Sequence, residues 1–233
     1  PREPEPPEPT TGELVATDKA GHRVPFTLRH TRVDAHVAGN LSRVSVTQVF
    51  ANPLTTPLEA VYSLALPEEA AVDQMDIKLG NRVIVGQIKQ RKEAKQIYDA
   101  AKANGQTAAL LDQERDNVFT QKVANIRPGE TIEVTVAYSD ALRFEGQDYA
   151  FFFPMAVGPR YITKSGVADA AAVSPPHLPV GQRSGRDVEV NLTIEAGVPV
   201  GRVTSPSHDV VVEGSPERRV VHLAPHDAIP NKG

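Results

Sequence analysis

The sequence predicts a mainly β protein, a β-sandwich of antiparallel strands with one principal α-helix at about residues 88–103. Several segments alternate apolar and polar residues, as strands do when they bury one face. At two places in the sequence, a Gly-Asn dipeptide separates two such segments, which is typical of a hairpin turn. Two packed sheets are the most economical architecture for such strands.

Two hairpins are expected in the first part of the chain. The alternating runs are 33–37 and 44–46 around Gly39-Asn40, and 75–79 and 83–85 around Gly80-Asn81. Glycine at the first central position suits a type II′ turn, whose twist matches that of the flanking strands. A further alternating strand, at 58–66, is expected between the two hairpins.

The helix is expected because Ala94, Ile97 and Ala101 recur at i, i+3 and i+7. Gly105 follows where a left-handed C-terminal cap is needed. After the helix, a short apolar run at 108–111 leads into what we interpret as a charged surface loop at 112–117.

A turn is predicted at residues 127–130, because Pro128 fixes φ at its second position and Gly129 accepts a positive φ at its third. Residues 132–138 then alternate as a half-buried strand, and 149–153 as another. The candidate core residues are Leu64, Leu66, Ile132, Val134, Val136, Tyr138, Phe151 and Phe153.

The order of these elements resembles the vault/inter-alpha-trypsin (VIT) domain over about residues 24–162. The matching residues are Gln48-Val49-Phe50, Asn52, 58–62, Leu66-Pro67, 70–72, Tyr98, Ala109-Leu110-Leu111, Phe119, Asn125-Ile126 and Pro128-Gly129. The resemblance implies a non-enzymatic interaction module, joined to a von Willebrand type A domain as in inter-alpha-trypsin heavy-chain-like proteins. The partners that it implies are proteins, among them a type A domain of the same full-length chain.

Four regions are predicted along the chain. Residues 1–22 are a proline- and glutamate-rich tether, 23–162 the VIT domain, 163–186 a loop or linker, and 187–233 a C-terminal β region. The C-terminal region is rich in valine and has few larger apolar side chains, so we expect it to pack on the VIT domain and to lead toward a type A domain.

Composition limits the classes of function. The 233 residues carry a net charge of −4, which does not favour nucleic acid or anionic membranes as partners, and contain no apolar run long enough to cross a membrane. There is no cysteine, which excludes disulfides and thiol chemistry. The chain starts at Pro1, so we expect a processed or trimmed piece of a larger protein. We expect that protein to be bacterial and to be secreted, periplasmic or on the cell surface, with a cytoplasmic location as the alternative.

Asp34 and His36 are the candidate metal ligands. With His30 they share one parity, opposite to Val33 and Val37, and neighbours on one face of a strand lie about 7 Å apart. They could converge on a cation such as zinc. A polar, solvent-facing strand surface explains the same pattern, and no second ligand cluster supports a metal.

A basic face is predicted on the helix, at Lys89, Arg91, Lys92 and Lys95. It is either an ordinary solvated helix face or a surface for an acidic partner, such as a polyanionic glycan or another protein. A carbohydrate- or polyanion-binding module is therefore the alternative function. The absence of tryptophan argues against sugar binding, which uses flat rings as platforms.

No catalytic residues and no cofactor are predicted. The chain has no Gly-x-Ser-x-Gly elbow, and Ser139 and Asp140 have no recognisable base beside them in the sequence. The Asp-x-Ser-x-Ser motif of type A domains is also absent, so that domain is not part of this sequence.

Overall fold

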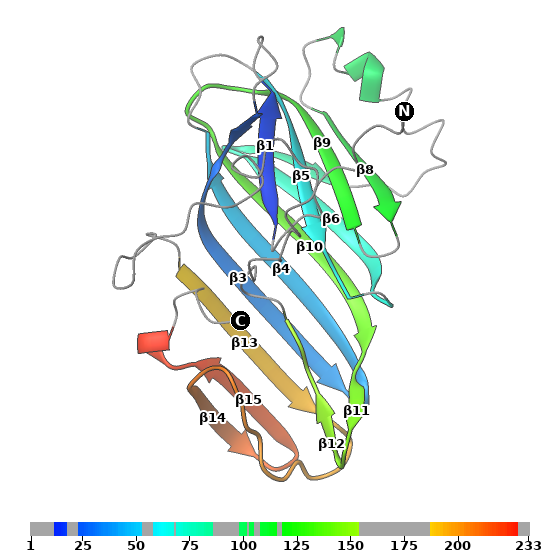
Figure 1. The fold of residues 1–233 in the computed structure, drawn as a ribbon, viewed down its shortest axis with the longest axis vertical. Helices are drawn as coiled ribbons and strands as arrows, with labels where there is room; N and C mark the ends of the chain where they lie inside the picture. The colour runs from blue at the N-terminus through cyan, green and yellow to red at the C-terminus, as the bar shows by residue number, and fades with distance from the viewer. Residues whose placement is uncertain are drawn as a thin grey trace, which may run out of the picture.

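The computed structural model describes residues 12–17, 23–52, 58–67, 69–85, 98–101, 103–104, 108–115, 118–153 and 187–227. Its strands form two large sheets and one separate hairpin (Figure 1).

The smaller of the two large sheets has five antiparallel strands in the order β2-β1-β5-β9-β8. The strands are β1 (Glu13–Thr17), β2 (Arg23–Pro25), β5 (Leu58–Ala65), β8 (Ala108–Arg115) and β9 (Val118–Ile126).

The larger sheet has eight strands in the order β14-β15-β13-β3-β4-β10-β6-β7. They are β3 (Thr27–Ala38), β4 (Leu41–Ala51), β6 (Ala71–Leu79), β7 (Arg82–Val85), β10 (Thr131–Ala141), β13 (Asp187–Glu195), β14 (Val210–Ser215) and β15 (Arg218–Leu223). All neighbours are antiparallel except β13 and β3, which are parallel. The last three strands that the structure describes, β13, β14 and β15, therefore extend the sheet that the first part of the chain builds.

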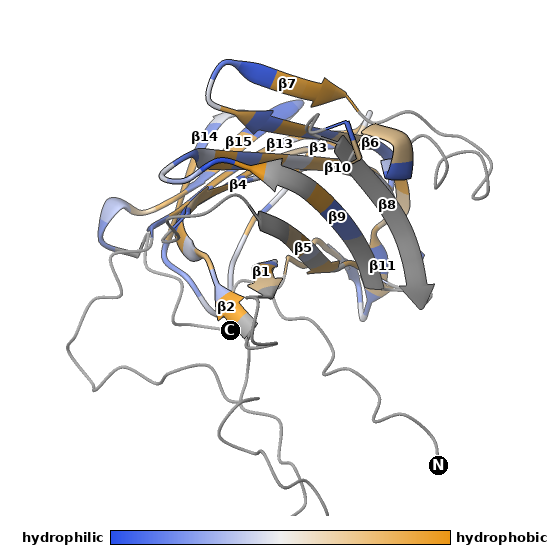
Figure 2. Cartoon of the chain, turned by 90° about the horizontal axis from the view of Figure 1, so that it is seen from above, coloured by the Kyte–Doolittle hydropathy of each residue, from blue (hydrophilic) through white to orange (hydrophobic). Residues whose placement is uncertain are grey.

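The two large sheets face each other as the layers of a sandwich (Figure 2). Alternation along each strand sends one set of side chains between the layers. Tyr62 and Leu64 of β5 lie there together with Val46 of β4 and Val134 of β10. The predicted mainly β sandwich is confirmed.

Six of the predicted core residues are buried: Leu64, Leu66, Ile132, Val134, Val136 and Tyr138. Phe151 and Phe153 are only half-buried, although they pack against the core. The predicted strand at 149–153 is wrong in its extent, because β12 (Asp148–Ala150) ends before these residues and pairs only with β11 (Arg143–Glu145). The two phenylalanines contact the core from a connecting segment, which alternation cannot distinguish from a strand.

The predicted turns are present. Gly39 joins β3 to β4 with φ +62°, and Gly80 joins β6 to β7 with φ +55°. Gly129 has φ +69° between β9 and β10, as a turn of the predicted kind requires. These turns require a left-handed backbone, which glycine adopts without strain and a residue with a side chain does not.

The charged loop predicted after Leu111 is wrong. Residues 108–115 form β8, which pairs along β9 at the edge of the five-stranded sheet. These residues form a strand because their backbone pairs with β9, and an edge strand accommodates charged residues readily. The predicted helix is described only at residues 98–101 and 103, where Tyr98 is buried; residues 88–97 and 102 lie outside the described residues.

No helix within the described ranges combines the length and apolar character needed to cross a lipid bilayer.

The burial of Val134 gives a test of the register of β10. Val134→Ala is expected to lower the free energy of unfolding by about 1–3 kcal/mol, because it removes two methyl groups from a side chain with 0% exposure. Val83→Ala on β7, where the side chain is 61% exposed, should change it by less than about 0.5 kcal/mol. Urea titrations of both variants measure the difference, and equal losses would contradict the register.

Candidate functional site

A ladder of polar side chains runs along the outer face of the eight-stranded sheet, where β3, β13 and β15 lie side by side. The residues of this polar ladder are His30, Arg32, Asp34 and His36 of β3, Asp187, Glu189, Asn191 and Glu195 of β13, and Arg218 and His222 of β15. The parallel register sets Asp187 beside His30 and Asn191 beside Asp34. Both candidate metal ligands thus belong to one ladder.

Asp34 has partners on both of its carboxylate oxygens. Arg32 Nε donates to Oδ2 at 2.7 Å and Arg32 Nη2 to Oδ1 at 3.1 Å. Asn191 Nδ2 also donates to Oδ1, at 2.9 Å. Burial by itself would raise the pKa of Asp34, but the hydrogen bonds from Arg32 and Asn191 outweigh it and lower that pKa.

His36 has a different partner from Asp34. Its Nε2 lies 2.7 Å from Oε2 of Glu195, whose other oxygen lies 3.2 Å from Nε of Arg218. The hydrogen bond to His36 is the main cause that lowers the pKa of Glu195. Asp34 and His36 share a face but do not converge on one point.

Two more contacts continue the ladder. His30 Nδ1 lies 3.0 Å from Oδ1 of Asp187, and His222 Nδ1 lies 2.8 Å from Oδ1 of Asn191. Among the residues that the structure describes, no group of three or more histidine and carboxylate side chains is placed to hold a metal ion. The ladder instead joins neighbouring strands, and its half-exposed charges each contribute little to stability.

The basic helix face at Lys89, Arg91, Lys92 and Lys95 lies outside the described residues. It stays a prediction.

A second polar cluster joins the end of β4 to two turns, and the sequence pattern did not reveal its contacts. Asn52 follows β4; its Nδ2 donates to the carbonyl of Arg127 at 2.8 Å, and its backbone N–H donates to the carbonyl of Glu130 at 3.2 Å. Glu130 Oε2 accepts from the backbone N–H of Arg127 at 2.8 Å, while Oε1 lies 2.5 Å from Nη2 of Arg82. Asn52 thus holds the β9–β10 turn against β4, and Arg82 adds the β6–β7 hairpin.

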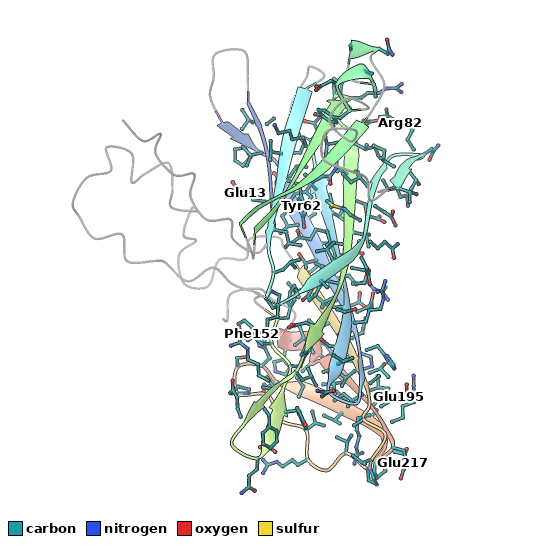
Figure 3. The ribbon with its side chains drawn as sticks, turned by 90° about the vertical axis from the view of Figure 1, so that its right-hand side faces the viewer. Glu13, Tyr62, Arg82, Phe152, Glu195 and Glu217 are labelled. Atoms are coloured by element: carbon teal, nitrogen blue, oxygen red, sulfur yellow. The ribbon has the colours of Figure 1, made fainter. Side chains whose placement is uncertain are left out.

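A third cluster lies in the interior of the sandwich around the buried Tyr62, which Figure 3 labels. The hydroxyl of Tyr62 on β5 donates to Oε1 of Gln48 on β4 at 2.7 Å, and Nε2 of Gln48 donates to Oγ1 of Thr31 at 3.4 Å. The ring of Tyr62 meets that of Phe50 edge-on, with centroids 6.0 Å apart. Complete burial raises the pKa of Tyr62 far above its ordinary value, so the hydroxyl keeps the proton that it donates.

The backbone at Gly12 approaches this cluster closely. A Cβ at that position would come within 1.8 Å of Oε1 of Gln48. Gly12 also has φ +88°, so a larger residue there would be strained as well as crowded. Glycine at this position therefore allows the backbone before β1 to approach Gln48 this closely.

The cluster at Asn52 predicts a loss of stability on truncation. Asn52→Ala should cost about 1–3 kcal/mol of unfolding free energy, because the carbonyl of Arg127 loses a donor at a nearly buried site. Asn52→Asp keeps the size of the side chain but not its N–H donor, and should cost a similar amount. Chemical denaturation measures both; an unaffected Asn52→Asp variant would contradict the role of this hydrogen bond.

Tyr62 and Tyr138 form a matched pair for a second test. Tyr62→Phe should cost about 1–3 kcal/mol, because Oε1 of Gln48 loses a donor in the interior. Tyr138→Phe should be neutral or stabilising, because the buried hydroxyl of Tyr138 has no hydrogen-bond partner in the described part of the chain. Thermal unfolding compares the variants, and the opposite order would refute the assignment.

Comparison with known proteins places this fold in context. Residues 28–138 match the model of the vault protein inter-alpha-trypsin domain family. Human protein mono-ADP-ribosyltransferase PARP4 is 32% identical over 142 residues, which are 61% of this chain and 8% of that protein.

Two further relatives share the same region. Human von Willebrand factor A domain-containing protein 5A is 29% identical over 163 residues, 68% of this chain and 21% of that protein. Human inter-alpha-trypsin inhibitor heavy chain H6 is 25% identical over 147 residues, 61% of this chain and 11% of that protein. The chain thus matches only a small part of each of these relatives.

Proposed function

We propose that this chain is a non-enzymatic protein-interaction module of a larger protein that also carries a von Willebrand type A domain, because residues 28–138 match the model of the VIT family. The observation that carries the proposal is the match to the VIT family together with a relative named for its von Willebrand factor A domain. The transferase activity in the name of another relative belongs to a protein of which the match covers 8%.

The polar clusters support a structural role for these side chains over a catalytic one. In the polar ladder, the side chains of Asp34, His36 and Glu195 have partners in neighbouring residues. In the turn cluster, both oxygens of Glu130 are occupied in the same way. Groups that satisfy each other hold strands in place and offer no activated nucleophile or base.

We also propose the division of the chain into a tether at 1–22, the VIT domain at 23–162, a linker at 163–186 and a C-terminal β region at 187–233. The parallel pairing of β13 with β3 supports close packing of the last region on the VIT domain. That region then connects the module to the type A domain, in an extracytoplasmic protein of a bacterium. A cytoplasmic location is the alternative, and cell fractionation distinguishes the two.

The test begins with the gene around this sequence. A type A domain encoded after Gly233 is expected, and its separately expressed form should bind this chain in isothermal titration calorimetry. A catalytic domain in that place would point to an accessory role instead. Binding to heparin but not to the type A domain would favour the polyanion-binding alternative.

A further inference from the structure

The hairpin of β11 and β12 forms a two-stranded sheet of its own at one end of the molecule (Figure 1). Every residue of its two strands is exposed except Ala150, which is half-buried. An isolated hairpin is at best marginally stable in water. We call residues 143–150 together with Phe152 the aromatic arm.

One face of the aromatic arm is apolar. Phe144 and Tyr149 are directly opposite each other, with ring centroids 5.0 Å apart and the rings tilted by 56°. This cross-strand pair helps the hairpin to form. The rings nevertheless remain 63% and 58% exposed, and Phe152, just beyond the hairpin, is 72% exposed. Phe152 lies on the side of the molecule opposite Glu195 of the polar ladder (Figure 3).

The other face of the hairpin carries an unbalanced charge. Glu145 and Asp148 are direct cross-strand neighbours at the tip, and both are exposed. Like charges in this position destabilise a hairpin. Arg143 lies on the same face, opposite Ala150, so this face of the hairpin carries two negative groups and one positive group. Among the described residues, neither carboxylate has a hydrogen bond or an ion pair.

We propose that the aromatic arm is a docking element that enters an apolar groove of a partner protein whose rim carries arginine or lysine. This inference rests on the proposed interaction function and adds the surface and the chemistry of the partner. The exposed rings supply apolar area to bury, as aromatic anchors do in protein interfaces. A cation beside Glu145 and Asp148 relieves their repulsion and fixes the orientation of the arm.

Arginine suits this place better than lysine. Its planar guanidinium binds a carboxylate through two hydrogen bonds and also stacks on an aromatic ring. Phe144 and Tyr149 are next in sequence to Glu145 and Asp148 and lie on the opposite face of the thin hairpin, so a groove that encloses the hairpin contacts both the rings and the carboxylates. The net charge of −4 on the whole chain also attracts a cationic partner over longer distances.

The test uses synthetic peptides as probes and the whole 233-residue chain as receptor. One peptide alternates leucine with arginine, and a matched peptide alternates leucine with glutamate. Fluorescence anisotropy should show a preference of about tenfold or more for the arginine peptide, falling as salt rises. Phe144→Thr with Tyr149→Thr should weaken its binding by about tenfold, whereas Val83→Thr, an equally exposed apolar site on β7, should not.

A charge exchange tests the chemistry directly. Glu145→Lys with Asp148→Lys keeps two like charges at the tip and should invert the preference toward the glutamate peptide. Glu213→Lys with Glu217→Lys makes the same change in net charge on the β14–β15 hairpin and should leave the preference for arginine intact. Thermal unfolding of every variant verifies that the fold is kept.

The outcomes separate this inference from the proposed function. The inference is overturned if the wild-type chain does not discriminate between the peptides, if both charge exchanges act alike, or if the rings bind neutral lipid vesicles in place of peptide. It is also overturned if the ring variant binds the type A domain as tightly as the wild type, a result that leaves the interaction module standing. A wild-type chain that selects the arginine peptide but binds no type A domain contradicts the proposed partner alone.

Discussion

The burial of one face of β3, β4 and β10 is the constraint on which the rest of the structure depends. These three adjacent strands are among the longest of the chain and pair without interruption over most of their length. Because side chains alternate, a shift of one residue in either pairing would exchange the inner and outer faces. The core of the sandwich and the polar ladder are therefore two consequences of one register.

The buried side chain of Gln48 adds a polar contact that helps to fix this register. An amide in an apolar core is costly unless its donors and acceptor are paired. Here Tyr62 of the opposite sheet and Thr31 of the neighbouring strand supply hydrogen bonds, and Gly12 leaves room for the amide. The hydrogen bond from Tyr62 links the two layers at a defined point, whereas apolar contacts alone would tolerate small displacements between them.

On the outer surfaces of the part that the structure describes, some polar groups have hydrogen-bond or ion-pair partners within the protein, and other exposed groups have none. In the polar ladder and in the cluster at Asn52, charged and polar groups meet partners from neighbouring strands or turns. Such groups join elements and have little left to offer a ligand. The aromatic arm differs, because its rings are exposed and its carboxylates face each other. A surface that would gain by being covered is the more natural place for a partner.

The sequence by itself determined the strands with clear alternation, the glycine turns and most of the core, because these follow from local periodicity and from the backbone freedom of single residues. The residues around Pro128-Gly129 also carry the resemblance to the VIT family, whose model matches residues 28–138. The tertiary structure alone decided that residues 108–115 form a strand, since backbone pairing with β9 overrides their charge. It alone decided that Asp34 meets Asn191 and that His36 meets Glu195, because these partners lie on β13, more than 150 positions further along the chain. Alternation shows which face a side chain occupies, but contacts between distant strands depend on the order of strands in the sheet, which no local pattern contains.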